Sequence, residues 1–359
     1  MSDEGEKMAG SLYRIFENPE TKQSVAVSFR PFCKGDGEGF RQCIADFYGD
    51  GYPYKEYLEE EFLLEKCASG EMTVLCGLKD QGEIISTSAV RMDEEFKGSA
   101  LLMLRVVKKA YRGMGIGKAQ EESLFWYAER REGVCSLYAD VMTHNSISQG
   151  SLVRRGFVYC GLRLMLYRNP VMVPGLPLSR DGKMSQAVMC RKGNKQSAEV
   201  LHCPSEQAGE VQRIYGELGV KCRIDTEYSS PVCKETVMAW KEEEEHHSYI
   251  VTVRKVGRDL SEMLARKMEQ TGRQKDVTVL CYLNLRDPAA VYGYEGFRQA
   301  GFFFTGLKPL QEREEYMILA HTGKQKMRYG DIHLHEDGRR LFSYIKAQQG
   351  YPSEEKSIP

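Results

Sequence analysis

The sequence predicts a mixed α/β protein with two domains in tandem. Stretches typical of strands and of helices alternate along most of the 359 residues. A proline-rich segment interrupts this alternation, because Asn169 to Pro177 holds three prolines that disfavour regular structure. A similar order of elements then returns. We therefore expect five regions: a leader at 1–23, a domain at 24–170, a linker at 171–185, a second domain at 186–325, and a C-terminal tail or helix at 326–359.

The composition is that of an ordinary globular protein. It is 42% hydrophobic and 28% charged, and the length suits about two domains of ~150 residues each. The formal net charge of −1 gives no electrostatic reason to expect nucleic acid or an anionic membrane as a partner. No apolar run reaches the ~18 residues that a membrane-spanning helix needs.

The cysteines predict a reducing compartment. There are 11 of them, with no Cys-x-x-Cys pair, and several lie in apolar runs, as Cys76 and Cys281 do. The N-terminal residues are acidic and lack the apolar core of a signal peptide. We expect a cytoplasmic protein that is a monomer or a homodimer.

The first half predicts the order β–α–α–β–β–β–α–β–α–β. Its strands are expected at 24–30, 72–78, 84–91, 101–107, 135–142 and 158–167, and its helices at 37–48, at 55–68, from 116 onward, and at 145–155. The second half predicts strands at 186–191, 198–201, 221–228, 248–256, 277–283 and 316–320. Its helices are expected at 205–218, 259–271 and 288–300.

The most informative stretch is Leu101 to Lys118. An apolar run ends at Val106 and Val107, a turn containing Gly113, Gly115 and Gly117 follows, and a helical pattern begins at once. The first N–H groups of a helix lack partners and carry partial positive charge, and glycines let the backbone approach a phosphate closely. The stretch therefore predicts a pyrophosphate cradle.

Two nucleotide-binding motifs do not fit this cradle. A Walker A loop needs glycine and serine or threonine where Arg112 and Ala119 stand, and a dinucleotide fingerprint needs glycine where Lys118 stands. What remains is Arg-x-x-Gly-x-Gly after a strand, for which an ordinary glycine-rich connection is the alternative. The run from Val107 to Gly117 resembles the coenzyme A-binding signature of the GNAT acetyltransferases. Asn145, separated by ten residues from Gly156-Phe157, is similar to a second feature of that family.

The resemblance implies an α/β fold of GNAT-like acyl-CoA N-acyltransferase domains, with acetyl-CoA as co-substrate. The residues that it implies for coenzyme binding are Val106, Val107, Arg112, Gly113, Met114, Gly115, Ile116, Gly117, Lys118 and Asn145. It also implies that a backbone N–H near Val106 and Val107 meets the thioester oxygen as charge develops there. Tyr52 and Tyr54 lie in a loop that often forms the acceptor wall in the family.

The catalytic groups are less well defined. Asp140 and His144, after the cradle helix, are candidates for the base, and Glu94 and Glu95 are weaker ones. Many family members carry a tyrosine that protonates the leaving thiolate at the position of Leu152. Either another group does this here, such as Tyr159 or a water, or acid help is dispensable because a coenzyme A thiolate is already a fair leaving group.

The second half contains a partial repeat of the first. Gly156 to Leu162 (GFVYCGL) matches Gly301 to Leu307 (GFFFTGL). The corresponding cradle position, Lys255 to Ser261, has one glycine and an aspartate that would repel pyrophosphate. We expect a degenerate second GNAT-like domain that binds no coenzyme A.

The function expected from the resemblance is transfer of an acetyl or larger acyl group to a primary amine. The alternative is a catalytically weak acyl-CoA sensor or scaffold. The acceptor stays open. The charged run Glu242 to His247 and the pair His333 and His335 have no matching second ligand group, so no metal is expected.

Overall fold

The computed structural model describes residues 12–52, 54–131, 133–168, 183–193, 197–271, 276–323, 325, 327 and 329–349. Two compact units separate within it. The first contains the described residues up to 95 and 100–134, and the second contains 96–99, 135–168 and most of the chain after 177. The expected leader and linker lie in part outside the described residues.

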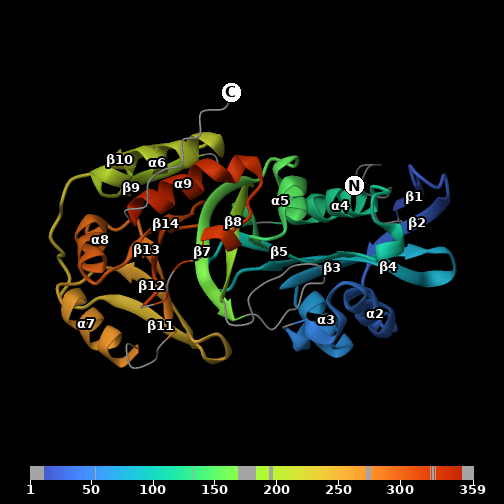
Figure 1. Ribbon diagram of the computed structural model, residues 1–359, viewed down its shortest axis with the longest axis horizontal. Helices are drawn as coiled ribbons and strands as arrows, with labels where there is room; N and C mark the ends of the chain where they lie inside the picture. The colour runs from blue at the N-terminus through green and yellow to red at the C-terminus, as the bar shows by residue number, and fades with distance from the viewer. Residues whose placement is uncertain are drawn as a thin grey trace. The chain divides into compact units, whose positions relative to one another are not determined.

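The first unit is an antiparallel sheet between helices. Its strands pair in sequence order and are β1 (Leu12–Glu17), β2 (Ser24–Pro31), β3 (Met72–Lys79), β4 (Glu83–Met92) and β5 (Ser99–Val107). Helices α2 (Gly37–Tyr48) and α3 (Glu60–Ala68) lie on one face, and α4 (Ile116–Glu129) lies on the other (Figure 1). Strand β1 falls in the segment expected to be a loose leader. There it pairs with β2 from Leu12 to Glu17.

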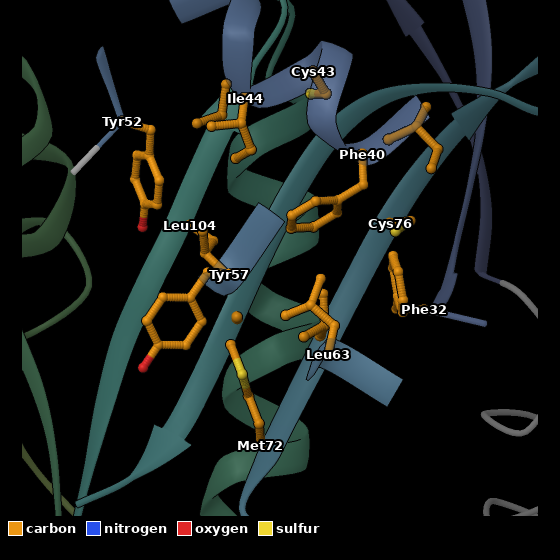
Figure 2. Close-up of a cluster of buried hydrophobic side chains, with 14 of the residues drawn as sticks. Phe32, Phe40, Cys43, Ile44, Tyr52, Tyr57, Leu63, Met72, Cys76 and Leu104 are labelled. Carbon is orange, nitrogen blue, oxygen red and sulfur yellow. The ribbon is translucent and has the colours of Figure 1, made fainter. Parts of the chain in front are cut away.

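Two apolar clusters fix these helices to the sheet. Phe40 and Ile44 of α2 and Leu63 of α3 are buried against Val74 and Leu104 of the sheet. Figure 2 shows the rings of Tyr52 and Tyr57 at one edge of this cluster. On the other face, apolar side chains of α4 pack with Val27, Phe29 and Ile85. Burial of such side chains contributes about 1.5–3 kcal/mol each relative to exposure.

The second unit contains a longer mixed sheet, with strand order β6-β8-β7-β14-β15-β13-β12-β11, and a separate parallel pair, β9 and β10. The strands are β6 (Ser136–Met142), β7 (Val158–Arg168), β8 (Lys183–Lys192), β9 (Ser197–His202), β10 (Lys221–Asp225), β11 (Val237–Glu243), β12 (Ser248–Lys255), β13 (Thr278–Asn284), β14 (Phe303–Lys308) and β15 (Tyr316–His321). The helices are α5 (Ser146–Val153), α6 (Ser205–Glu217), α7 (Leu260–Thr271), α8 (Ala290–Gln299) and α9 (Arg339–Gln348), which lies in the expected tail.

Strand β8 lies between β6 and β7 and pairs antiparallel with both. The proline-rich segment therefore joins two neighbouring strands of one sheet, although the sequence suggested a link between two domains. Most of β8 falls inside the region expected to form the second domain. A strand's own pattern does not say which strands it pairs with, so this insertion was not predictable from 186–191 alone.

The second unit contains two similar halves. Just as β8 lies between β6 and β7, β15 lies between β13 and β14, and the two sets meet where β7 pairs with β14. Strands β7 and β14 each carry a register shift at the same place, just before Gly161 in β7 and just before Gly306 in β14. Met165 and Leu310, nine residues after the respective Gly-Phe glycines, both have left-handed backbones.

Candidate functional site

The glycine-rich turn joins β5 to α4. Gly113 and Gly115 have φ angles of +81° and +87°, in the region that side-chain-bearing residues adopt only at a cost. Gly115 is the residue that caps the start of α4. A Cβ at either glycine would meet no atom within 4 Å, so the outer side of the turn faces open space. A bulky anion can therefore approach the backbone here.

The start of α4 offers unpaired amides to such an anion. The first hydrogen bond of the helix runs from the Ala119 N–H to the Gly115 carbonyl, over 3.1 Å. It leaves the amides of Ile116, Gly117 and Lys118 without a partner inside the helix. Three N–H donors and the positive end of the helix dipole together form the predicted cradle.

The turn is held from α2. The Asp46 carboxylate accepts a hydrogen bond from the Lys109 N–H at 2.6 Å and lies 3.5 Å from the Arg112 guanidinium. Arg112 also donates to the Val107 carbonyl at 2.8 Å, and its guanidinium lies 5.1 Å from the centre of the Phe47 ring. Arg112 thus fixes the turn, and Lys118 is the exposed cation beside the free amides. Sequence reasoning missed Asp46, because nothing local links it to a turn 63 residues away.

The basic residues around the turn are largely neutralised. Arg105 lies 2.5 Å from Glu121, and Lys108 lies 2.9 Å from Glu83. With Arg112 beside Asp46, these pairs neutralise three of the cations near the turn.

Strand β5 carries a bulge just before the turn. Leu104 is buried with a φ of +54°, and the register of β4 against β5 shifts between Thr87 and Ala89. The Thr87 hydroxyl donates to the Leu104 carbonyl at 2.8 Å and stabilises this conformation. A left-handed backbone at a non-glycine residue costs about 1–3 kcal/mol and is common at functional sites. The bulge redirects the strand shortly before Val106 and Val107.

Tyr52 and Tyr54 belong to a chain of aromatic rings beside α2 and α3. Consecutive rings contact edge to face, with centroids 4.7–6.2 Å apart. The chain runs through Phe47, Tyr48, Tyr52, Tyr54, Tyr57 and Phe62. Tyr52 is buried, and burial raises its pKa, whereas Tyr54 is 41% exposed. Only Tyr54 therefore offers a large part of its ring to a ligand.

Asn145 and His144 lie in the second unit, between β6 and α5. The Asn145 side chain caps α5 by accepting a hydrogen bond from the Ser148 N–H at 3.1 Å. Burial, with a smaller contribution from His333, lowers the pKa of His144. The uncharged imidazole is thus favoured near neutral pH, as a proton acceptor requires.

Asp140 has a strong partner of its own. One of its carboxylate oxygens lies 2.7 Å from a guanidinium nitrogen of Arg163, and the two side chains are only 12% and 11% exposed. One oxygen of the Asp140 carboxylate is therefore already engaged by the guanidinium. Of the two base candidates, His144 fits the role better.

Tyr159 is packed inside the second unit. It is 3% exposed, and its hydroxyl donates to Gln149 at 2.7 Å. Gln149 also accepts from the His335 N–H and donates to the His333 carbonyl, which ties the C-terminal segment to α5. A buried, engaged hydroxyl is poorly placed to protonate a thiolate, and Leu152 is fully buried as well.

One group of described side chains has metal-ligating chemistry. Ligand atoms of His335, Glu336 and Asp337 lie within 4.8 Å of one another on a largely exposed turn, where such clusters also occur without an ion. All 11 cysteines are free thiols. No helix in the described part of the chain has the length and apolarity needed to cross a membrane.

Comparison with known proteins identifies part of the chain. Residues 39–157, which include β5, the glycine-rich turn, α4 and Asn145, match the model of the Acetyltransferase (GNAT) family. These residues form a GNAT acetyltransferase domain. No curated protein matches the chain significantly.

Several solved structures are similar over about half of this chain. A GNAT-family acetyltransferase from Streptococcus pneumoniae is 18% identical over 47% of this chain and 99% of its own, with a TM-score of 0.38. Arabidopsis thaliana NAA60, in complex with a bisubstrate analogue, is 18% identical over 47% and 98%, with a TM-score of 0.36. The ribosomal-protein-S18-alanine N-acetyltransferase from Escherichia coli is 17% identical over 46% and 92%, with a TM-score of 0.35.

Proposed function

We propose that this chain, whose residues 39–157 form a GNAT acetyltransferase domain, transfers an acetyl group from acetyl-CoA to a primary amine. The observation that supports this most is the start of α4, where three unpaired amides follow two left-handed glycines in open space. In this proposal Val106 to Lys118 and Asn145 bind the coenzyme, and Tyr54 and Tyr52 line the acceptor site. The protein acts in the cytoplasm as a monomer or homodimer and needs no metal.

The reaction requires an uncharged amine. We assign His144 as the base, because its lowered pKa keeps the imidazole ready to accept a proton from the ammonium group. The amine then attacks the thioester carbon, the N–C bond forms and the C–S bond breaks. The products are the acetylamide, the coenzyme A thiol and one proton. The bulge at Leu104 supports a backbone N–H near Val106 as the donor to the developing oxyanion.

The second half is proposed to be a degenerate GNAT-like domain without a coenzyme site. The matching strand orders and register shifts support the repeat. In this half, the backbone amides just before α7 already donate hydrogen bonds to another segment of the chain. The amides of Arg258 and Asp259 donate to the carbonyls of Cys233 and Lys234, and the Gly257 amide donates to the Thr236 hydroxyl. A Cβ on Gly257 would lie 2.3 Å from the Glu235 carbonyl carbon, so no phosphate fits there.

The proposal predicts one acetyl-CoA per chain. In calorimetric titration we expect a stoichiometry of one. We also expect no measurable binding by Gly115→Glu, whose carboxylate would occupy the space in front of the amides. The side chain at 115 points into open space, so this variant should fold, although its left-handed backbone costs about 1–2 kcal/mol. Circular dichroism checks the fold. Unchanged affinity in the variant would refute the cradle.

One observation favours the alternative function, an acyl-CoA sensor or scaffold. The buried Leu152 stands where many GNAT enzymes carry the tyrosine that protonates the leaving thiolate. A thiol-release assay against a panel of amines separates the two. Turnover on any amine supports the enzyme, and binding of acetyl-CoA without turnover on the whole panel supports the sensor.

A further inference from the structure

Three polar side chains lie together on one face of the sheet in the second unit. Asp140 is on β6, Gln186 on β8 and Arg163 on β7, which are three consecutive strands of the sheet with β8 in the middle. Gln186 is the register partner of Arg163, and Val188, two residues further along β8, is the partner of Asp140. Register partners and residues two apart along a strand point to the same face. Tyr282, on β13, lies beside them, with its ring centre 5.8 Å from the Arg163 guanidinium carbon.

Each of these side chains has a buried polar atom without a hydrogen-bond partner among the described residues. The atoms are Asp140 Oδ1, Arg163 Nε, Gln186 Oε1 and the Tyr282 hydroxyl. Leaving such an atom unpaired costs about 1–3 kcal/mol, so four in one place need an explanation. Tyr282 is only 1% exposed, whereas Gln186 is partly exposed.

The charges of the group already balance. Burial alone would lower the pKa of Arg163, but the Asp140 carboxylate holds it well above its ordinary value, so the pair is ionised. A ligand of net charge would disturb this buried pair, because an unpaired charge there is costly. The unpaired atoms offer two N–H or O–H donors, on Arg163 and Tyr282, and two oxygen acceptors, on Asp140 and Gln186. They match a ligand that is neutral overall and carries both a cationic donor and an anionic acceptor.

The corresponding place in the second half is filled. By the strand pairing, Lys308 and Tyr316 take the positions of Arg163 and Gln186. There Phe96 inserts its ring, 4.8 Å from Tyr282 and 5.2 Å from Tyr316, and the Lys308 ammonium lies 4.1 Å from the Phe96 ring centre. Three members of the polar group, Asp140, Arg163 and Gln186, therefore lie in the half that carries Asn145 and His144, and the matching place in the other half has packed aromatic rings.

We propose that Asp140, Arg163, Gln186 and Tyr282 bind the α-ammonium and α-carboxylate groups of a free amino acid, which is the acceptor of the acetyl transfer. The ammonium is held by Asp140 and Gln186, and the carboxylate by Arg163 and Tyr282. This assignment rests on the proposed function and names its substrate class.

The test uses the full chain and a panel of free amino acids. Thermal shift and calorimetry measure the binding of each amino acid, first without and then with acetyl-CoA. We expect at least one amino acid to bind and to be acetylated. Tyr282→Phe and Gln186→Leu should each weaken its binding about tenfold or more, the loss of one buried hydrogen bond to a charged group. Tyr316→Phe is the matched control, because its hydroxyl already donates to Glu314 at 2.5 Å, and it should bind the amino acid normally.

The stability of Tyr282→Phe gives a second readout. Since the Tyr282 hydroxyl has no hydrogen bond of normal geometry and interacts with the neighbouring Arg163 guanidinium mainly electrostatically, its removal should leave the melting temperature of the free protein unchanged or higher. A lower melting temperature with unchanged amino-acid binding would overturn the assignment and indicate a structural hydroxyl. Binding of acetyl-CoA with no amino acid bound, or binding without acetylation, would also overturn it. Failure of acetyl-CoA to bind would instead remove the proposed function.

Discussion

Gly161 and Gly306 face each other across the junction of β7 and β14. They occupy the same place in the two matching segments of the chain, so the strands meet at the repeated residue. A Cβ on Gly306 would lie 2.1 Å from the Cα of Gly161, and φ at Gly306 is +138°. The two backbones can approach this closely only because both residues lack side chains.

Gly306→Ala should therefore destabilise the protein by about 2 kcal/mol or more, because the added methyl group forces the two strands apart. The measurement is the free energy of unfolding in urea. Gly209→Ala is the control, since a Cβ there meets nothing within 4 Å and the residue lies in helix α6. A loss no larger than that of the control would contradict the close approach.

Asp46→Asn should weaken acetyl-CoA binding about tenfold, since it removes the charged acceptor that holds the Lys109 amide and Arg112. Calorimetry measures the affinity. Asp50→Asn is the matched control, because Asp50 lies just beyond the same helix without an ion pair among the described contacts. Equal affinities for the two variants would show that the turn keeps its shape without Asp46.

Asp140→Asn should lower the free energy of unfolding by about 3 kcal/mol, because it leaves the guanidinium of Arg163 buried without its carboxylate. The double variant Asp140→Leu with Arg163→Met should recover most of this loss, since it removes both charges. Urea unfolding of the three proteins measures the effect. A single variant as stable as the wild-type protein would contradict this role of the ion pair.

The pH dependence of the transfer tests His144. Its folded pKa lies below the ordinary value of about 6.5, so the imidazole becomes protonated only as the pH falls below that value. We expect kcat/KM to fall with a midpoint below pH ~6.5, and to rise to a plateau above it. His333→Gln should raise the midpoint, because the neighbouring imidazole disfavours the charge on His144.

His144→Gln should lower kcat/KM and remove this step from the profile. His321→Gln is the control, because burial also lowers the pKa of His321, on β15, and it has no assigned role. A His144→Gln enzyme whose activity still falls at the same midpoint would exclude His144 as the base.

The local parts of this structure could be predicted from the sequence. The turn at Gly113 and Gly115 followed from glycine's backbone freedom and the helical pattern after it, both of which lie within a few residues. What could not be predicted depended on distant partners. Residues expected to form a leader form strand β1, because they pair with β2. Strand β8 pairs with β6 and β7, which both precede it in the chain.

The candidate catalytic residues show the same limit. Tyr159 was a reasonable candidate for the acid by its position in the sequence, but its hydroxyl donates a hydrogen bond to Gln149. Gln149 in turn donates to the carbonyl of His333, which is 184 residues further along the chain. Likewise, the partner of Asp140 is Arg163, on a strand that is not its neighbour. Hydrogen bonds and ion pairs of this kind leave no periodic signal in the sequence.

The insertion of β8 also bears on how the chain folds as it is made. Strands β6 and β7 each pair with β8, so neither gains its shared partner until the ribosome has passed Lys192. The segment matched by the family model ends earlier, at residue 157. During synthesis the edges of β6 and β7 that pair with β8 would therefore stay unpaired until a strand encoded beyond the proline-rich segment is made, and exposed edges of this kind favour aggregation.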